Sequence, residues 1–259
     1  MAYTKANLES WNEVAPLHME INSELQESVK KSGFNNLNKG VMTILDGLSV
    51  AGKSCVQICC NNGIDLLSVK KLGAHYCLGI DGADEFIQQA RIFSKNAGVD
   101  NIDFVTHNVY SIPETYSGQF DIGLITVGVL SWMPDLEGFF YSVSKLLKPG
   151  GYLVLEDLHP VLLMYEEGEP SYLNASYFET EPYKEEHGLD YFTGTKYDAK
   201  PNYSFQHTFS YILMSAIKAG LVLKSMEETP ENIGNFCADL EHTTCNPPLA
   251  FFAHWQKEG

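Results

Sequence analysis

The chain has no cluster of basic residues, and acidic side chains dominate its charge. There are 17 lysines and arginines against 33 aspartates and glutamates, for a formal net charge of −16. A surface this acidic repels both a nucleic-acid backbone and an anionic membrane. We therefore expect neither nucleic acid nor a membrane among its partners.

Long hydrophobic segments are also absent. No stretch approaches the roughly 18 consecutive apolar residues that a membrane-spanning helix requires. The first residues, MAYTKANLESWNEV, lack the basic head and apolar core of a secretory signal. These absences predict a soluble, cytoplasmic protein.

The cysteines show neither a disulfide framework nor a zinc pattern. Most of the six lie in apolar runs, where a free thiol behaves as a small hydrophobe, so we expect reduced thiols. Cys237, His242 and Cys245 come nearest to a metal site, but they lack the paired spacing of zinc ligands. We expect no bound metal.

What the sequence does contain is a regular alternation of apolar runs and helical patterns. Its length of 259 residues with 44% hydrophobic side chains suffices for a full core. Segments with apolar residues at helical spacing separate the expected strands. These segments end at residues that stop a helix, such as Gly73 and Lys148-Pro149-Gly150-Gly151. The expected strands are residues 55–60, 75–80, 102–105, 120–127 and 152–155. This alternation predicts a Rossmann-like, doubly wound, mainly parallel sheet.

The flanking segments complete the expected organisation. Residues 1–50 are expected to form a helical cap, and residues 51–160 with 206–259 the sheet domain. Two last strands, at 221–226 and 249–255, bring the sheet to seven strands with an antiparallel last strand. Residues 161–205 break the periodicity and hold seven of the fourteen tyrosines, Tyr191 among them. We expect an insertion over the acceptor end of the sheet, either an aromatic box for an apolar or cationic molecule or a plain aromatic core.

The residues just after each strand are the candidates for binding, because ligands of such sheets lie beyond the carboxyl ends of the strands. Asp81 follows the second strand, where a carboxylate can accept hydrogen bonds from both hydroxyls of a ribose. Capping of the next turn is the alternative role for Asp81. The first turn, VQICCNNG, offers only Gly63 instead of G-x-G-x-x-G, which disfavours a nicotinamide dehydrogenase.

Five ordered motifs carry a resemblance to a known family. VQICCNNG is similar to V-L-D-L-G-C-G-x-G, with Gln57 at the acidic position and Cys59, Asn61 and Gly63 at the glycines. GIDGADEFIQQAR, NIDFVTHNVYSIP and FDIGLITVGVLSWMPDLEGFFYSVSKLLKPGGYLVLEDLHP match the later elements in order. Over residues 10–160 the chain thus resembles a class I S-adenosylmethionine-dependent methyltransferase of the small-molecule type.

The resemblance implies roles for individual residues. Residues 57–63 and 126–128 would hold the methionine moiety, Asp81 the ribose, and Asn108 with Val109 the adenine. Trp11 and His18 would close the site, while Trp132 is either an aromatic wall or a core residue. The implied cofactor-binding set is Trp11, Gln57, Cys59, Cys60, Asn61, Gly63, Asp81, Gly82, Asn108, Val109, Thr126, Val127, Gly128 and Trp132. Candidates for a base or acceptor contact are His159, His18 and His207, each with a purely structural role as the alternative.

The departures from the family pattern lead to a conformational prediction. Asparagine tolerates the left-handed region better than other residues with a side chain. We expect Asn61 or Asn62 to adopt a positive φ and Cys59 to pack away from the cofactor.

The expected function is methylation of a small molecule at oxygen, nitrogen or carbon with S-adenosyl-L-methionine, giving S-adenosyl-L-homocysteine. The alternative is a protein that binds this cofactor but has lost or altered transfer activity, suggested by Gln57, Cys59 and Asn61. A monomer or homodimer is expected.

Overall fold

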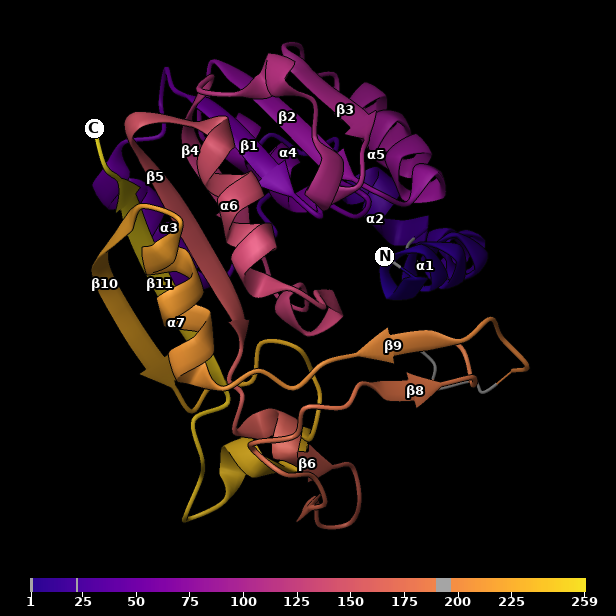
Figure 1. Cartoon of the computed structure of the whole chain (residues 1–259). Helices are drawn as coiled ribbons and strands as arrows, with labels where there is room; N and C mark the ends of the chain where they lie inside the picture. The colour runs from indigo at the N-terminus through magenta and orange to yellow at the C-terminus, as the bar shows by residue number, and fades with distance from the viewer. Residues whose placement is uncertain (1, 22, 190–196) are drawn as a thin grey trace.

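A seven-stranded sheet organises the computed structural model, which describes residues 2–21, 23–189 and 197–259 (Figure 1). The strand order is β10-β11-β5-β4-β1-β2-β3, and β11 runs antiparallel to both of its neighbours. The strands are β1 (Ser54–Ile58), β2 (Tyr76–Asp81), β3 (Ile102–Thr106), β4 (Phe120–Ile125), β5 (Leu147–Leu158), β10 (Leu221–Thr229) and β11 (Ala250–Lys257). The predicted fold class is confirmed.

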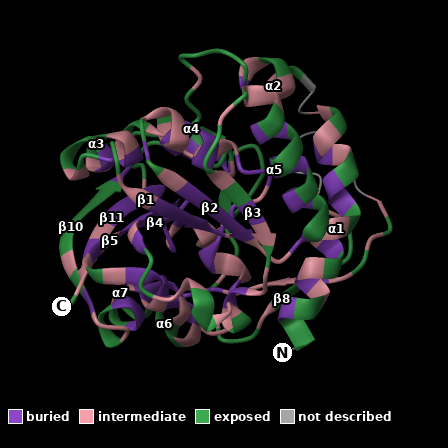
Figure 2. Cartoon of the chain, turned by 90° about the horizontal axis from the view of Figure 1, so that it is seen from above, coloured by how far each residue is buried: buried purple, intermediate pink, exposed green. Residues whose placement is uncertain are grey.

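Helices cover both faces of this sheet and bury it between two apolar layers (Figure 2). On one face lie α3 (Lys39–Leu48), α4 (Ile64–Lys71) and α5 (Asp84–Ala97), and on the other α6 (Leu136–Leu146) and α7 (Phe209–Lys218). Along β1, Cys55 packs toward α3 and α4, whereas Val56 packs toward α6. This alternation follows from the two-residue period of a strand.

Strand boundaries differ from the predicted ones at the carboxyl edge. The apolar runs extend to Cys60 and Val127, but the strands end at Ile58 and Ile125. Cys59 has φ +55, a left-handed conformation that ends the extended ladder. Strand β5 begins at Leu147, before the predicted Tyr152, because Phe120 pairs with Leu147 across the sheet.

The N-terminal segment is mainly helical, as predicted, with α1 (Ala2–Ile21) and α2 (Ser23–Ser28) before α3. Val14 and Ala15 of α1 pack on Ala83 and Phe86 at the start of α5. Helix α1 therefore lies beside the carboxyl end of β2.

Two small antiparallel strand pairs lie beyond the end of β5, within the described part of residues 161–205 (Figure 1). The first pairs β6 (Tyr165–Glu166) with β7 (Tyr172–Leu173), and the second pairs β8 (Tyr183–Glu185) with β9 (Asn202–Ser204). Tyr191 lies outside the described residues. A long connection joins β10 to β11, as the predicted bounds of the last two strands implied, and its Leu240 packs with Leu162.

Candidate functional site

The turn after β1 has a strongly bent backbone. Cys59, Asn61 and Gly63 have φ values of +55, +48 and +74. The prediction that Asn61 or Asn62 adopts a positive φ is confirmed at Asn61. A Cβ at Gly63 would lie 2.5 Å from the Phe104 ring, so this position requires glycine for space as well as for conformation.

The two cysteines of this turn are held among apolar side chains. Cys60 is buried, and Cys59 packs against the apolar core on the α6 face. Burial raises the pKa of both thiols, and the nearby Asp81 carboxylate raises it further. Both residues are therefore neutral thiols at physiological pH. That Cys59 points away from a cofactor stays a prediction.

Asp81 ends β2 and joins it to the turn after β1. Its Oδ2 accepts a hydrogen bond from the Asn61 N–H at 2.8 Å, and its Oδ1 accepts one from the Ala83 N–H at 2.8 Å. Burial raises the pKa of this carboxyl, while the backbone N–H groups lower it. Each carboxylate oxygen accepts more than one hydrogen bond, so the capping role leaves capacity for two hydroxyl donors.

Helix α1 covers the neighbouring end of the sheet. Leu8 packs so closely on Gly82 that a Cβ there would lie 2.6 Å from it. The Trp11 ring lies 5.2 Å from that of Trp132 and 6.0 Å from that of Phe86. Trp11 thus bridges α1 to the segments that follow β4 and β2. That Trp11 and His18 close a cofactor site stays a prediction.

His18 lies on the same helix and uses a ring nitrogen on the backbone. Its Nε2 is 3.1 Å from the Leu189 carbonyl oxygen, and its ring centroid is 5.7 Å from that of Phe86. His18 thereby links α1 to the segment that follows β8.

Asn108 follows β3 and caps a short helix. Its Oδ1 accepts a hydrogen bond from the Tyr110 N–H at 3.0 Å, and Val109 is buried in the core. The residues predicted to meet an adenine therefore lie on a fixed turn next to Asp81, since Thr106 pairs with Asp81 in the sheet.

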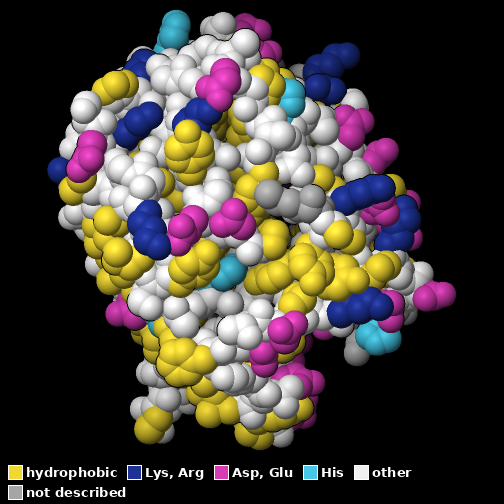
Figure 3. Space-filling view, in the orientation of Figure 1, with side chains coloured by type: hydrophobic (Ala, Val, Ile, Leu, Met, Phe, Trp, Pro, Cys, Tyr) yellow, Lys and Arg dark blue, Asp and Glu magenta, His cyan; other side chains and the backbone are white. Residues whose placement is uncertain are grey.

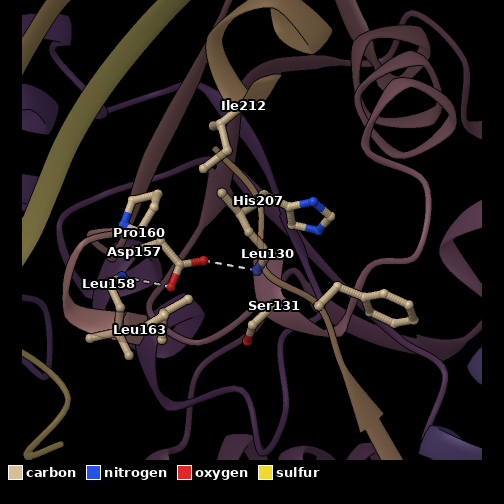
Figure 4. Close-up of a pocket in the computed structure, with 9 residues that line it drawn as sticks. Leu130, Ser131, Asp157, Leu158, Pro160, Leu163, His207 and Ile212 are labelled. Carbon is tan, nitrogen blue, oxygen red and sulfur yellow. Dashed lines mark hydrogen bonds between the residues drawn. The ribbon is translucent and has the colours of Figure 1, made fainter. Parts of the chain in front are cut away.

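The loop after β4 is fastened to β5 by a residue that the sequence did not single out. The Asp157 carboxylate accepts hydrogen bonds from the backbone N–H groups of Gly128 and Leu130. Figure 4 shows the bond from Leu130. Burial raises its pKa to about 6, although these N–H donors lower it. Its place after Glu156, at the end of the fifth strand, was the only sequence signal. Thr126, Val127 and Gly128 lie in this loop.

A row of polar side chains lies where these strands end. Gln57 is 1% exposed, and its Nε2 donates to Thr126 Oγ1 at 3.1 Å. The Asn38 amide donates to the buried Glu156 carboxylate at 3.0 Å, and the Asn36 amide donates to Asp65 at 2.7 Å. Of these, Gln57 and Thr126 belong to the set that the sequence indicated.

His159 and His207, which lie near the end of β5 and before α7, have backbone partners. His159 Nδ1 accepts from the Val161 N–H at 3.1 Å, and its Nε2 lies 2.9 Å from Glu228 Oε1. His207 Nε2 lies 2.9 Å from the Met133 carbonyl oxygen. Burial lowers the pKa of both imidazoles, so they are mainly neutral at pH 7.

A narrow cavity lies between the loop after β4, the end of β5 and residues 205–212 (Figure 4). Its volume is about 10 Å³, room for one water molecule. The lining residues are Leu130, Ser131, Asp157, Leu158, Pro160, Leu163, Phe205, His207 and Ile212.

Among the residues that the structure describes, no helix is long and apolar enough to cross a membrane. Within the same ranges, no three or more histidine, cysteine or acidic side chains gather as a metal site would require.

Known proteins share both sequence and fold with this chain. Residues 56–155 match the methyltransferase domain family. A ubiquinone biosynthesis O-methyltransferase of Erwinia tasmaniensis is 32% identical over 108 residues, which cover 42% of this chain and 43% of the relative. One of the same name from Shewanella pealeana is 26% identical over 136 residues, covering 52% and 56%. The chain thus spans about half the length of these curated relatives.

Solved structures match over most of the chain. An S-adenosylmethionine-dependent methyltransferase from Mesorhizobium loti superposes with a TM-score of 0.62 at 18% identity, covering 85% of this chain and 99% of that one. A geranyl diphosphate C-methyltransferase from Streptomyces coelicolor gives 0.59 at 12% identity, covering 84% and 78%. At such identities the likeness establishes the fold.

Residues 56–155 are a methyltransferase domain, and the chain has the class I fold of the S-adenosylmethionine-dependent methyltransferases. The predicted methyltransferase domain is confirmed over residues 56–155, and the predicted class I fold is confirmed for the chain.

Proposed function

We propose that this protein transfers a methyl group from S-adenosylmethionine to a small molecule. The observation that carries the proposal is Asp81, which ends β2 within the methyltransferase domain and keeps acceptor capacity for a ribose diol. The turn at residues 59–63 and the loop at 126–128 would hold the methionine moiety, and Asn108 with Val109 the adenine.

The proposed division of labour follows from the chemistry. The cofactor, when bound, supplies an electrophilic methyl group for in-line displacement. The chain's own residues position the acceptor and exclude water, which can be worth roughly 7 to 11 kcal/mol of the barrier. Trp11 and Trp132 are suited to exclude water, because their rings pack edge to face with centroids 5.2 Å apart.

The acceptor is proposed to enter beside the narrow cavity. Apolar side chains dominate its lining, with Ser131, Asp157 and His207 as polar groups. We propose His207 as the acceptor-side histidine, since it lines this cavity, whereas His159 packs against Phe209 and Phe251. An apolar small molecule with one polar atom suits such a lining. The relatives are named as O-methyltransferases and the solved neighbour as a C-methyltransferase, so the methylated atom is proposed to be oxygen or carbon before nitrogen.

Residues 161–205 are proposed to act as a lid, with residues 1–50 as the cap it closes against. Asn7 makes a reciprocal pair with Tyr203: its Nδ2 donates to the carbonyl oxygen at 2.8 Å, and its Oδ1 accepts from the N–H at 2.7 Å. The rings of Tyr3 and Tyr203 lie 4.9 Å apart. Figure 3 shows apolar side chains gathered where β8 and β9 cross the face. Because the cavity holds only about one water, an acceptor requires this lid to open.

A cytoplasmic setting and a monomer or homodimer complete the proposal. The net charge of −16 disfavours nucleic acid and anionic membranes as partners.

Calorimetry with S-adenosylmethionine and S-adenosylhomocysteine tests cofactor binding. Binding of neither up to millimolar concentrations would contradict the proposal. A metabolite screen for methyl transfer, repeated with Asp81→Ala, then separates an enzyme from a protein that only binds the cofactor. Transfer that depends on Asp81 excludes the second reading.

A further inference from the structure

Three polar side chains form a row across the sheet on the face covered by α3 and α4. Each of the three follows an apolar residue by two positions along the chain. Gln57 follows Cys55, Thr126 follows Leu124, and Glu156 follows Val154. Cys55, Leu124 and Val154 belong to the apolar layer of that face. By the two-residue period of strands, Gln57, Thr126 and Glu156 continue this layer to the carboxyl edge as polar groups.

A second set of polar groups closes the row from above. Asp65, in the first turn of α4, accepts a hydrogen bond from the Asn36 amide and interacts with the side chains of Thr126 and Gln57. The Asn38 amide donates to Glu156 Oε2. Two carboxyl groups are thus brought together without a basic partner among the groups that these contacts name.

One acceptor of the cluster lacks a partner. The Gln57 amide lies inside it, since Nε2 donates to Thr126 and the same side chain interacts with Asp65. Its Oε1 is buried and has no hydrogen-bond partner. A buried acceptor left unpaired costs about 1–3 kcal/mol, so it points to a donor supplied by a ligand.

The protonation states of Asp65 and Glu156 also favour binding of a cation. Burial raises the pKa of Asp65, and burial together with the neighbouring Asp65 and Asp157 raises the pKa of Glu156 to about 8. Two further neighbours of Glu156 are neutral: Asn38, which donates to it, and Phe252, which pairs with it on β11. A cation would allow both carboxyl groups to ionise.

We propose that Gln57, Asp65 and Glu156 form the receptor for the α-ammonium group of the cofactor's methionine moiety. An ammonium group has three N–H donors, which match one orphan amide oxygen and two carboxylates. The chain turns from Gln57 and Thr126 directly into the two loops proposed to hold that moiety. Asp65 and Glu156 then supply the charge that Gln57 lacks at the family's acidic position. This inference rests on the proposed function.

The test compares two ligands in four proteins by calorimetry. The ligands are S-adenosylhomocysteine and an analogue in which hydrogen replaces its α-amino group. The proteins are wild type, Asp65→Asn, Glu156→Gln and the control Glu227→Gln, an exposed acid on β10. Wild type and the control should prefer S-adenosylhomocysteine by roughly ten- to hundredfold, as expected for a charged hydrogen-bonded group. Each cluster variant should reduce this preference at least threefold.

An unchanged preference in both cluster variants would overturn the receptor while leaving the proposed function intact. Failure of wild type to bind either ligand would instead remove the proposed function. If the cluster variants do not fold, a measurement on wild type tests the receptor instead. The number of protons that wild type releases on binding each ligand at pH 7 is obtained by calorimetry in buffers of different ionisation enthalpy. Glu156 should release more protons with S-adenosylhomocysteine than with the analogue, and equal release overturns the receptor.

Discussion

The Asp157 carboxylate accepts a hydrogen bond from the Gly128 N–H, with 2.7 Å between Oδ1 and the nitrogen. Its other oxygen accepts from the Leu130 N–H at 2.8 Å. One side chain of β5 thereby fixes the loop after β4. Gly128 has φ +88, a conformation that a residue with a side chain adopts only with strain, so the loop depends on both residues.

Replacing Asp157 should lower the stability of the fold and weaken cofactor binding at the site. In Asp157→Asn an amide N–H faces a backbone N–H, so a buried charged hydrogen bond is lost, at a cost of about 1.5–3 kcal/mol. We expect a lower free energy of urea unfolding at pH 7 and weaker binding of S-adenosylhomocysteine. Glu185→Gln, at an exposed position of β8, is the control and should change neither. Unchanged stability in Asp157→Asn would show that these hydrogen bonds do not hold the loop after β4.

Glu156 should make stability depend on pH. Its pKa is raised to about 8 in the folded protein, against about 4.3 in an unfolded chain. Between these values the folded state binds more protons, so the free energy of unfolding falls as pH rises, by up to ~1.4 kcal/mol per pH unit. Urea unfolding at pH 5, 6, 7 and 8 measures this slope. Glu156→Gln should flatten it, and an equal slope in that variant would show that other groups are responsible.

Asp81 should control cofactor affinity. In Asp81→Asn the carboxylate is replaced by an amide with one acceptor oxygen, so it cannot serve the Asn61 N–H, the Ala83 N–H and a ribose diol together. We expect a loss of S-adenosylhomocysteine affinity of roughly ten- to hundredfold by calorimetry. Glu85→Gln in the first turn of α5 removes a nearby charge without these bonds. Equal losses in the two variants would indicate a general charge effect.

The contact between cap and lid is testable without knowing the acceptor. Asn7→Ala removes both hydrogen bonds to Tyr203, each worth about 0.5–1.5 kcal/mol. The Tyr203 amide should then lose hydrogen-exchange protection by roughly three- to tenfold or more, while amides of β4 stay unchanged. Glu9→Gln, an exposed neighbour on α1, should leave both unaffected. Protection of Tyr203 that survives Asn7→Ala would place the closing contacts elsewhere.

Much of the site's frame was predictable from local pattern. The apolar runs and their punctuation located the strands, and parallel strands place their carboxyl ends on one edge, so the turn at Asn61, Asp81 and Asn108 came together as expected. Strand ends were less predictable, because apolar residues such as Cys59 continue past the ladder with a left-handed backbone.

The side-chain partnerships were beyond such a pattern. Asp65 and Asn38 meet Gln57 and Glu156 only because α3 and α4 pack on the same face of the sheet. Asp157 is an acid in an apolar strand, and its role depends on the exact path of the loop it holds. Long-range pairs of this kind are set by tertiary packing, which periodicity does not encode.

The backbone of Asn61 gives the last prediction. At φ +48 a residue with a Cβ is strained by roughly 1–2 kcal/mol, and asparagine lessens this cost through its own side chain. Here Asn61 Oδ1 accepts a hydrogen bond from the Asn62 N–H at 2.7 Å. Asn61→Ala should therefore destabilise the protein by about 1–2 kcal/mol in urea unfolding, whereas Asn61→Gly should change it much less, because glycine loses the bond but also the strain. Both variants keep the N–H that Asp81 accepts, so their difference isolates the backbone conformation. Equal stability of the two variants would mean that the left-handed turn imposes no strain on this site.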